Sequence, residues 1–542
     1  MLRKAFFIFH LQMIFLAAYS QQKEFVITNY GAKPDGISNN VAAIQRAIDA
    51  ATSAGGGKVI IPRGRFLSGV IRLRTNVELN IHEEAVLLAS TNRADYGPSL
   101  KASAFIVADN EKNVAITGRG LIDGQCDLLI DDIYKKLISG ELYDDEWKEY
   151  NPWHQRRPSE NNRPRMVELS NCDGVTIKNV RMQNATAWVQ NYRNCSNIVI
   201  DSIQVFSNTF LNNDGIDLVD CRKARITNCF VNAADDGICL KSHDRNSRCE
   251  DIYIADCKVR SSASAIKLGT ASRGGFKNII IKNITVYDTF RSAIAIEAVD
   301  GGIIENIDVR NINAVNTGNA IFIRLGHRNN DEVYSQLRNV YIGDIKVQVP
   351  TAKPDKGYPM EGPELRYPST LKADTTIQYS GKAPWHTYSF DTTSALIPHH
   401  IFPSSIVGLP GHYVENVKLE NIEIIYEGYP AKEMSKYSGP SLKEVPEVPN
   451  SYPEFSMFGE LPAWGLYVRH VKGLELKNVS LKVKNNDARS ACVFDDAEGL
   501  VLDNLSIPNY QQLPVIIMNK VKDPVVTKLN LPVDKAKAVK IQ

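Results

Sequence analysis

The sequence predicts an all-β fold, a right-handed parallel β-helix (a solenoid) with an N-terminal capping helix and long cleft-forming loops. Short units, each with two alternating apolar runs, recur roughly every 21 to 31 residues from Cys172 onward. Asn, Asp or Gly separates the two runs, which is typical of strand, tight turn and strand. One unit cannot bury its apolar face alone, whereas units stacked at about 4.8 Å per rung form a continuous core.

Ten units follow this pattern, and a turn residue recurs inside them. The units begin at Cys172, Cys195, Cys221, Cys249, Phe276, Ile303, Leu337, Val414, Gly473 and Gly499. The recurring turn residues are Asn179, Asn228, Asn283, Asn478 and Asn504. Asparagine tolerates the left-handed backbone that tight bends between stacked strands require. We therefore expect about ten rungs.

The end of an open stack needs a cover, and residues 41–51 predict one. Five apolar side chains recur there at helical spacing, and Asn40 precedes them as a candidate N-cap. The glycines at 55–57 lead directly into an apolar run. They predict a turn rather than a phosphate-binding loop, because no Gly-Lys-Ser/Thr follows.

The chain divides into a leader, one solenoid domain and a tail. Residues 1–20 resemble a signal peptide, because Arg3 and Lys4 precede an apolar run that ends in small residues. A buried N-terminal helix is the alternative. We expect an exported protein (periplasmic, cell-surface or extracellular) without a membrane span.

The β-helix should cover residues 21–520, with a solvated tail at 521–542. Insertions rich in Pro, Tyr and Trp interrupt the rungs and should build a cleft; they lie near 126–165, 350–412 and 428–462.

Composition restricts the partners. Lys and Arg number 63 against 61 Asp and Glu, so the net charge of +2 argues against a nucleic-acid-binding protein. We expect a monomer that binds a polysaccharide or oligosaccharide, with no cofactor and no metal. The chain has nine cysteines and no C-x-x-C pair, and six of the cysteines recur in repeat slots: Cys172, Cys195, Cys221 and Cys249 in one set, and Cys229 and Cys257 in another. Stacked free thiols are the favoured interpretation, and a disulfide or two remains the alternative.

One column of carboxylates departs from the structural pattern. Asn213-Asp214-Gly215-Ile216-Asp217 is followed 22 residues later by Asp235-Asp236-Gly237-Ile238. Aligning the segments places Asp214 beside Asp236 on adjacent rungs, with Asp235 and Asp217 nearby. Carboxylates this close raise one another's pKa, so one can stay protonated beside an ionised neighbour. Glycosidic bond cleavage requires that combination. An Asp-rich solvated turn and a calcium site are the alternatives.

At these residues the chain resembles glycoside hydrolase family 28, which contains pectin-degrading polygalacturonases and rhamnogalacturonases. NYGAKPDG from Asn29, GGGKVIIPRGRFLSG, ITGRGLIDG from Ile116 and RPRMVELSNC from Arg163 are similar to its N-terminal half. NNDGID resembles its N-T-D motif and ADDGI its paired-Asp motif. The resemblance implies that Asp235 is the general acid, that Asp214 and Asp236 activate water, and that the anomeric carbon is inverted.

The chain departs from the family at three positions. Ser264 stands where the family has the His of its G-H-G motif, and Ala295 and Glu297 stand at the Arg and Lys of its R-I-K motif. Those two cations bind the substrate carboxylate, and a Glu cannot replace a Lys in that task. Trp188 matches a rung position that the family also fills with Trp and is interpreted as structural.

Four residues are candidates for substrate binding. Lys267 lies in an outward slot between Asp236 and Glu297, so we expect it to contact the acidic group of a sugar. His243 follows the acidic rungs and can be a surface loop residue instead. Arg324 faces Glu297 on the next rung and can simply pair with it. Asp217 completes the acidic column.

Three functions remain open. The first is a secreted inverting glycoside hydrolase acting on a pectic (galacturonate- or rhamnogalacturonan-type) polysaccharide or oligosaccharide. The long insertions then suggest a cleft closed at one end, hence exo action or a branched substrate. The second is a polysaccharide lyase on the same fold, which would use Lys267 and the Asp cluster. The third is a non-catalytic carbohydrate-binding β-helix.

Overall fold

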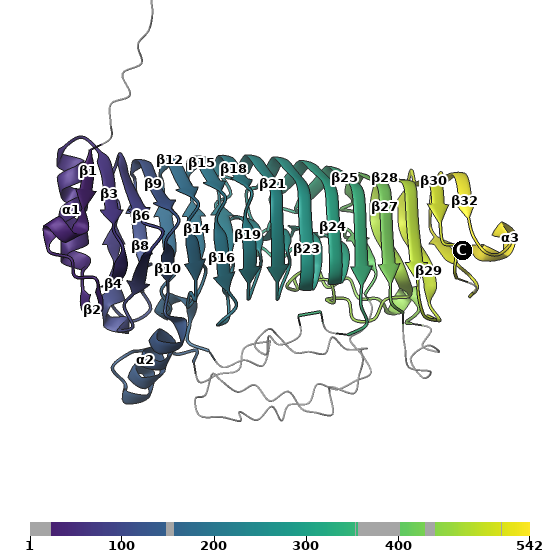
Figure 1. The fold of residues 1–542 in the computed structure, drawn as a ribbon. Helices are drawn as coiled ribbons and strands as arrows, with labels where there is room; N and C mark the ends of the chain where they lie inside the picture. Colours follow the sequence, from purple (N-terminus) through teal and green to yellow (C-terminus); the bar gives the residue numbers. More distant parts are fainter. Residues whose placement is uncertain (1–22, 148–156, 353, 356–401, 429–438, 511) are drawn as a thin grey trace, which may run out of the picture.

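The computed structural model describes residues 23–147, 157–352, 354–355, 402–428, 439–510 and 512–542. This part of the chain winds into one elongated solenoid (Figure 1). Helix α1 (Val41–Ser53) covers its N-terminal end, and the C-terminus lies at the opposite end. Each strand pairs in parallel with the strand one coil away. The predicted right-handed parallel β-helix is confirmed.

Three parallel sheets form the faces of the solenoid. The first contains β1 (Glu24–Val26), β3 (Gly57–Ile61), β6 (Val77–Ile81), β9 (Lys112–Gly118), β12 (Asp173–Lys178), β15 (Ser196–Asp201), β18 (Arg222–Thr227), β21 (Cys249–Ser261), β23 (Gly275–Ala298), β24 (Ile303–Leu325), β25 (Gln336–Val349), β27 (Val414–Tyr426), β28 (Ala463–Val483), β30 (Val501–Ser506) and β32 (Val525–Asn530). The second begins with β2 (Asp35–Asn39), β4 (Gly64–Ser68), β7 (Ala85–Ala89), β10 (Leu121–Asp123), β13 (Arg181–Gln183), β16 (Gln204–Ser207) and β19 (Phe230–Ala233).

The third sheet carries the polar residues of interest. It contains β5 (Ile71–Arg72), β8 (Ile106–Asp109), β11 (Val167–Ser170), β14 (Gln190–Arg193), β17 (Ile216–Val219), β20 (Ile238–Ser242), β22 (Ile266–Ser272), β26 (Ser404–Val407), β29 (Ser490–Glu498), β31 (Ile516–Asn519) and β33 (Val539–Ile541). The long strands β23 and β24 bend through corners and contribute to this sheet with their last residues.

Identical positions of successive coils stack in columns. In the first sheet Ile200, Ile226, Ile254 and Ile281 are register partners, and all are fully buried. The predicted turn asparagines have the expected left-handed backbone, for example φ 56° at Asn283. The side chains of four of them donate hydrogen bonds to the preceding coil: Asn228, Asn283, Asn478 and Asn504. Both the apolar columns and the turns therefore confirm the predicted repeat.

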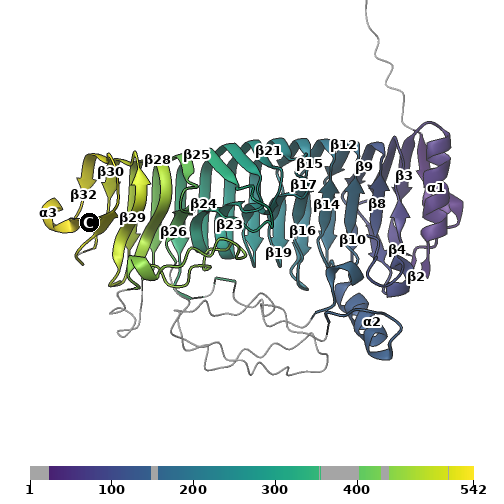
Figure 2. The same cartoon turned by 180° about the vertical axis from the view of Figure 1, so that it is seen from behind.

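The capping helix is also confirmed, because the apolar stripe of α1 is buried. Helix α2 (Cys126–Ser139) forms part of the first insertion. It lies along the same long edge of the solenoid as the third insertion, of which residues 439–462 are described (Figures 1 and 2). Short 3-10 helices occur at Ile27–Tyr30, Arg93–Tyr96, Glu160–Asn162 and Leu442–Glu444.

Two expectations about the chain ends have different outcomes. The leader predicted at residues 1–20 lies outside the described residues. The predicted tail at 521–542 is not free: β32 pairs with β30 and β33 pairs with β31, with α3 (Lys535–Ala538) between them. These residues form a last coil, because alternating apolar side chains continue beneath the many lysines. No helix in the described part of the chain has the length and apolarity that crossing a membrane requires.

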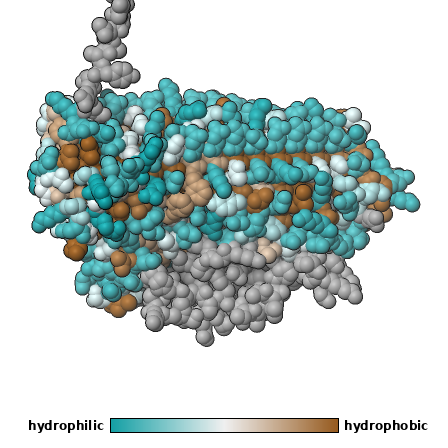
Figure 3. Space-filling model, in the orientation of Figure 1, coloured by the Kyte–Doolittle hydropathy of each residue, from teal (hydrophilic) through white to brown (hydrophobic). Residues whose placement is uncertain are grey.

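The face in Figure 3 is mostly hydrophilic, with a narrow apolar band along the solenoid axis.

The nine cysteines are all buried and free. Two of the repeat-slot cysteines illustrate the predicted stacking: the backbone N–H of Cys172 donates to Sγ of Cys195 on the next coil at 3.4 Å. The free-thiol interpretation is confirmed, and the alternative of a disulfide is wrong.

Stability should therefore not depend on disulfides. A reducing agent should leave the midpoint of thermal unfolding unchanged within about 1 °C, because no covalent cross-link restricts the unfolded chain. Differential scanning calorimetry with and without dithiothreitol measures this. A midpoint that falls by several degrees in the reductant would contradict the free-thiol structure.

Candidate active site

The predicted acids come together on the outer face of the third sheet. Asp214 lies two residues before β17, and Asp235 and Asp236 lie three and two residues before β20. The backbone N–H of Gly215 donates to the carbonyl of Asp236 at 2.9 Å, which fixes the register of the two coils. Carboxylate oxygens of the three Asp residues lie within 4.8 Å of one another. The 22-residue spacing therefore predicted their proximity correctly.

A cavity of about 310 Å³ opens over these carboxylates. Its walls combine five cationic side chains with four acidic ones, and two aromatic rings lie at its sides. The lining residues are Arg157, Glu160, Trp188, Asn212, Asp214, Asp235, Asp236, Lys241, Lys267, Thr270, Ala271, Arg291, Arg328 and Tyr452.

Lys267 lies where the sequence places it. Its Nζ is 3.1 Å from Oδ2 of Asp236 and 3.8 Å from Oε2 of Glu297. It also donates a hydrogen bond to the Tyr452 hydroxyl at 3.1 Å. Only 2% of Lys267 is exposed, so the two carboxylates compensate an ammonium that is almost fully desolvated.

A second lysine bridges two carboxylates on the other side of the cavity. Nζ of Lys241 lies 2.9 Å from Oδ2 of Asp214 and also pairs closely with Asp217. Its ammonium stands 4.3 Å from the centroid of the Trp188 ring. Asp217 is fully buried and does not line the cavity. Its expected contact with substrate is thus wrong in this structure, and Asp217 instead holds Lys241.

The electrostatics separate the protonation states of the paired Asp residues. Burial and the charges of Asp214 and Asp236 raise the pKa of Asp235 to about 7. Burial also disfavours the charge of Asp236, but Lys267 and further cations outweigh it and lower the pKa of Asp236. Near neutral pH, a carboxyl group that can hold a proton therefore lies beside an ionised one.

The remaining acids are shifted upward. Burial and the neighbouring Asp217 raise the pKa of Asp214 well above its usual value, against the opposing effect of Lys241. Burial raises the pKa of Asp217 to about 6 and that of Glu297 to about 7. The cluster therefore shares protons rather than carrying a full negative charge on each group.

His243 and Arg324 lie outside this cavity. His243 is exposed and lines a neighbouring cavity. Arg324 is fully buried and donates to the backbone carbonyls of Gly408, Glu447 and Val448. The expectation that it contacts substrate or pairs with Glu297 is wrong, because the third insertion covers it. The alternation of the sequence indicates that Arg324 points outward, but it does not indicate that an insertion covers the side chain.

The three Asp carboxylates are also the described residues that could together hold a metal ion. Two lysine ammonium groups already neutralise part of this cluster, one at Asp214 and one at Asp236. A bound cation would have to compete with both.

Comparison with known proteins places this geometry. The model of glycosyl hydrolases family 28 matches residues 52–356. The chain belongs to this family. A probable polygalacturonase of Vitis vinifera is 26% identical over 346 residues, which are 60% of this chain and 60% of the grape protein. An exo-poly-alpha-D-galacturonosidase of Dickeya chrysanthemi is 23% identical over 73% of this chain and 71% of its own length. The solved exopolygalacturonase of Thermotoga maritima has the same fold, with a TM-score of 0.54 and 22% identity over 75% of this chain and 87% of its own.

Ser264, at the position where the resemblance places the family's His, contacts the acids through its backbone. Ser264 is buried, and its backbone N–H donates to Oδ1 of Asp236 at 3.1 Å. Sequence reasoning missed Arg291 and Tyr452 as cavity residues and interpreted Trp188 as structural. Trp188 lies between β13 and β14, on the coil directly before the acidic rungs. The register of that coil could therefore have indicated that the Trp188 ring lies beside the Asp cluster. Tyr452 could not be found this way, because it belongs to an insertion without register.

Replacing the proposed acid should stabilise the fold. A carboxyl whose pKa rises from its usual value to about 7 keeps its proton in the folded state while the unfolded chain loses it, so stability falls as pH rises through this window. Asp235→Asn removes that loss. We expect it to be about 1–3 kcal/mol more stable than the parent at pH 7.5 and nearly equal at pH 4. Urea unfolding at both pH values measures this, and equal stability at pH 7.5 would contradict the raised pKa.

Proposed function

We propose that the protein is an exported glycoside hydrolase that cleaves a galacturonate-containing pectic polysaccharide or oligosaccharide. The observation that carries the proposal is the protonatable Asp235 beside the ionised Asp236 and near Asp214, all lining one cavity. The names of the polygalacturonase relatives support the substrate class. The leader-like residues 1–20 support export, and the near-neutral charge fits a sugar chain as partner rather than a nucleic acid.

The chemistry follows from the separated protonation states. Asp235 donates its proton to the glycosidic oxygen as the bond from that oxygen to the anomeric carbon breaks. Asp236, with Asp214 on the adjacent coil, accepts a proton from a water whose oxygen attacks the same carbon from the opposite face. The leaving sugar gains the proton of Asp235 and the product gains the hydroxyl, with inversion. The Lys267 ammonium keeps Asp236 ionised as a base.

Cations for a sugar carboxylate come from other positions than in the family motif. Lys267 is the register partner of Ala295, so a cation occupies the same column one coil earlier. Arg291 and Arg328 line the cavity as well. A guanidinium suits a carboxylate, and we propose that Lys267 and Arg291 bind the uronate at the cleavage site, whereas Arg328 is already held by two hydrogen bonds to Asp300.

The third insertion supports action from a chain end. Beyond Lys267, the outward side chains of the third sheet are covered: Ala295 and Phe322 pack with Phe455, Phe458 and other apolar residues in a buried cluster. Tyr452 of the same insertion contacts Lys267. A sugar chain cannot continue over these coils, so we propose exo action.

Activity should depend on Asp235. We expect Asp235→Asn to lower kcat on oligogalacturonides by at least about 100-fold, because the proton donor is lost. The matched control is Asp256→Asn, since Asp256 is a turn Asp with left-handed backbone in a column where Asn also occurs. Reducing-end assays measure the rate, and NMR of fresh product identifies the inverted anomer.

Three results would contradict this mechanism. A variant as active as the parent would remove Asp235 as the acid. Unsaturated products that absorb in the ultraviolet would identify a lyase. Tight binding of pectic fragments without any cleavage would identify a carbohydrate-binding protein.

Exo action has its own signature. We expect polygalacturonate to yield only the shortest products from the first time points, with viscosity falling slowly, because the covered coils admit a chain end only. Chromatography of early products measures this. An early ladder of intermediate lengths would show endo action instead.

A further inference from the structure

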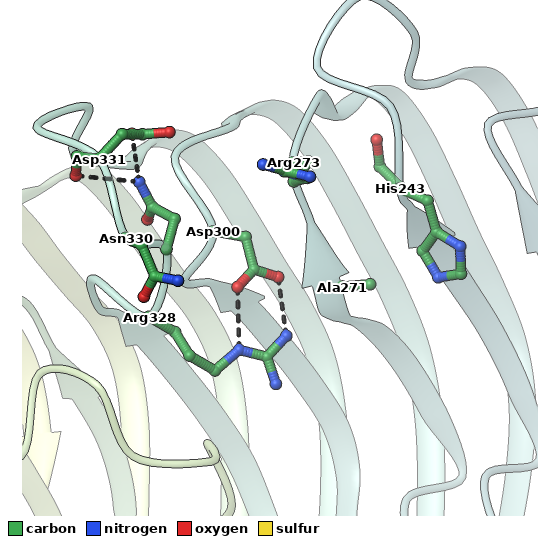
Figure 4. Close-up of a pocket in the computed structure, with 9 residues that line it drawn as sticks. His243, Ala271, Arg273, Asp300, Arg328, Asn330 and Asp331 are labelled. Atoms are coloured by element: carbon green, nitrogen blue, oxygen red, sulfur yellow. Dashed lines mark hydrogen bonds and ion pairs between the residues drawn. The ribbon is translucent and has the colours of Figure 1, made fainter.

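A second, larger cavity of about 600 Å³ adjoins the catalytic one. Ala271 and Arg328 line both cavities, so the two lie side by side. Figure 4 shows the second cavity between His243 on one side and Asn330 and Asp331 on the other. Its volume is within the range of about 300–1,000 Å³ typical of small-ligand sites. The proposed reaction does not use it.

The charges in this cavity leave one cation uncompensated. Arg328 makes two hydrogen bonds of 2.9 Å to the carboxylate of Asp300 (Figure 4). Asp331 pairs with Arg245 at the rim. Arg273 is exposed, and its guanidinium has no ion pair or side-chain hydrogen bond with any residue the structure describes. The cavity therefore offers one guanidinium to an anionic ligand.

The other walls suit the hydroxyls of a sugar. Partial burial and Arg193 lower the pKa of His243, so its ring is neutral near pH 7 and can donate and accept hydrogen bonds. Asn330 adds an exposed amide. A ring with one carboxylate and several hydroxyls matches this combination of groups better than a purely apolar or polyanionic ligand.

We propose that this cavity binds a second carboxylate-bearing sugar of the same chain, with Arg273 as its carboxylate ligand and specificity residue. The inference rests on the proposed function for the identity of the ligand. Adjacency at Ala271 and Arg328 carries it: the cavity that holds Arg273 begins where the cavity over the Asp cluster ends, so a chain whose first sugar lies over the Asp cluster reaches Arg273 with its next units. The apolar cover over Phe322 closes the alternative direction along the sheet.

Binding tests this without requiring turnover. Isothermal titration calorimetry, run in the Asp235→Asn background to prevent cleavage, compares galacturonate with trigalacturonate. We expect Arg273→Gln to weaken trigalacturonate binding about tenfold and to leave galacturonate binding unchanged, because one charge-assisted contact is lost. Arg273→Lys should retain part of the affinity. Arg222→Gln, an exposed arginine that lines neither cavity, is the matched control and should bind like the background protein.

A trimer whose carboxylates have been reduced to alcohols provides the chemical control. It should bind the background protein and Arg273→Gln equally. The inference is overturned if Arg273→Gln binds trigalacturonate within twofold of the background protein, or if the trimer binds no tighter than the monomer. Failure of hydrolysis by the parent would instead contradict the proposed function, while a charge-dependent loss in Arg273→Gln would still support the second site.

Discussion

The coil-to-coil register of the parallel sheets is the constraint on which the site depends. Parallel pairing fixes the position of every side chain relative to its counterpart one coil away, at about 4.8 Å. Buried Ile columns make a slip by one residue costly, because every inward side chain would turn outward. Asp214 and Asp236 inherit their separation from this register and not from any contact of their own. The core therefore holds like charges at a distance that free side chains would avoid.

Two buried lysines make this arrangement tolerable. Lys241 forms ion pairs with Asp214 and Asp217, and Lys267 forms ion pairs with Asp236 and Glu297. Each ammonium lies between two carboxyl groups, and its charge opposes the rise in their pKa that burial causes; only for Asp236 does the lysine prevail. Asp235, in contrast, is only half-buried and its strongest influences raise its pKa. Asp236 is thus ionised and Asp235 can hold a proton because Lys267 pairs with Asp236 and not with Asp235.

The sequence correctly predicts the elements that repeat, and its predictions fail for segments that lie outside the repeats. The β-helix, the cap α1, the turn asparagines and the acidic cluster all follow from periodicity, and so does the slot of Lys267. Arg324 is an outward residue of the same sheet, but insertion residues bury it, and no period reveals which coil an insertion covers. The coil formed by residues 521–542 was hidden for a different reason: its lysines suggest a tail, although pairing with β30 and β31 needs only a few apolar residues.

Ala295 connects the loss of a family cation with the shape of the cleft. An arginine at this outward position would place a charge against Phe322 and Phe455, whereas a methyl group packs with them. The cation in this column is instead Lys267, one coil nearer to the acids, where Asp236 compensates it. Glu297 then becomes a second partner of Lys267 and accepts a hydrogen bond from Thr270 at 3.0 Å. The methyl group of Ala295 therefore both permits the apolar cover and leaves this coil without a charge, and a second position, Lys267, supplies the cation one coil nearer to the acids.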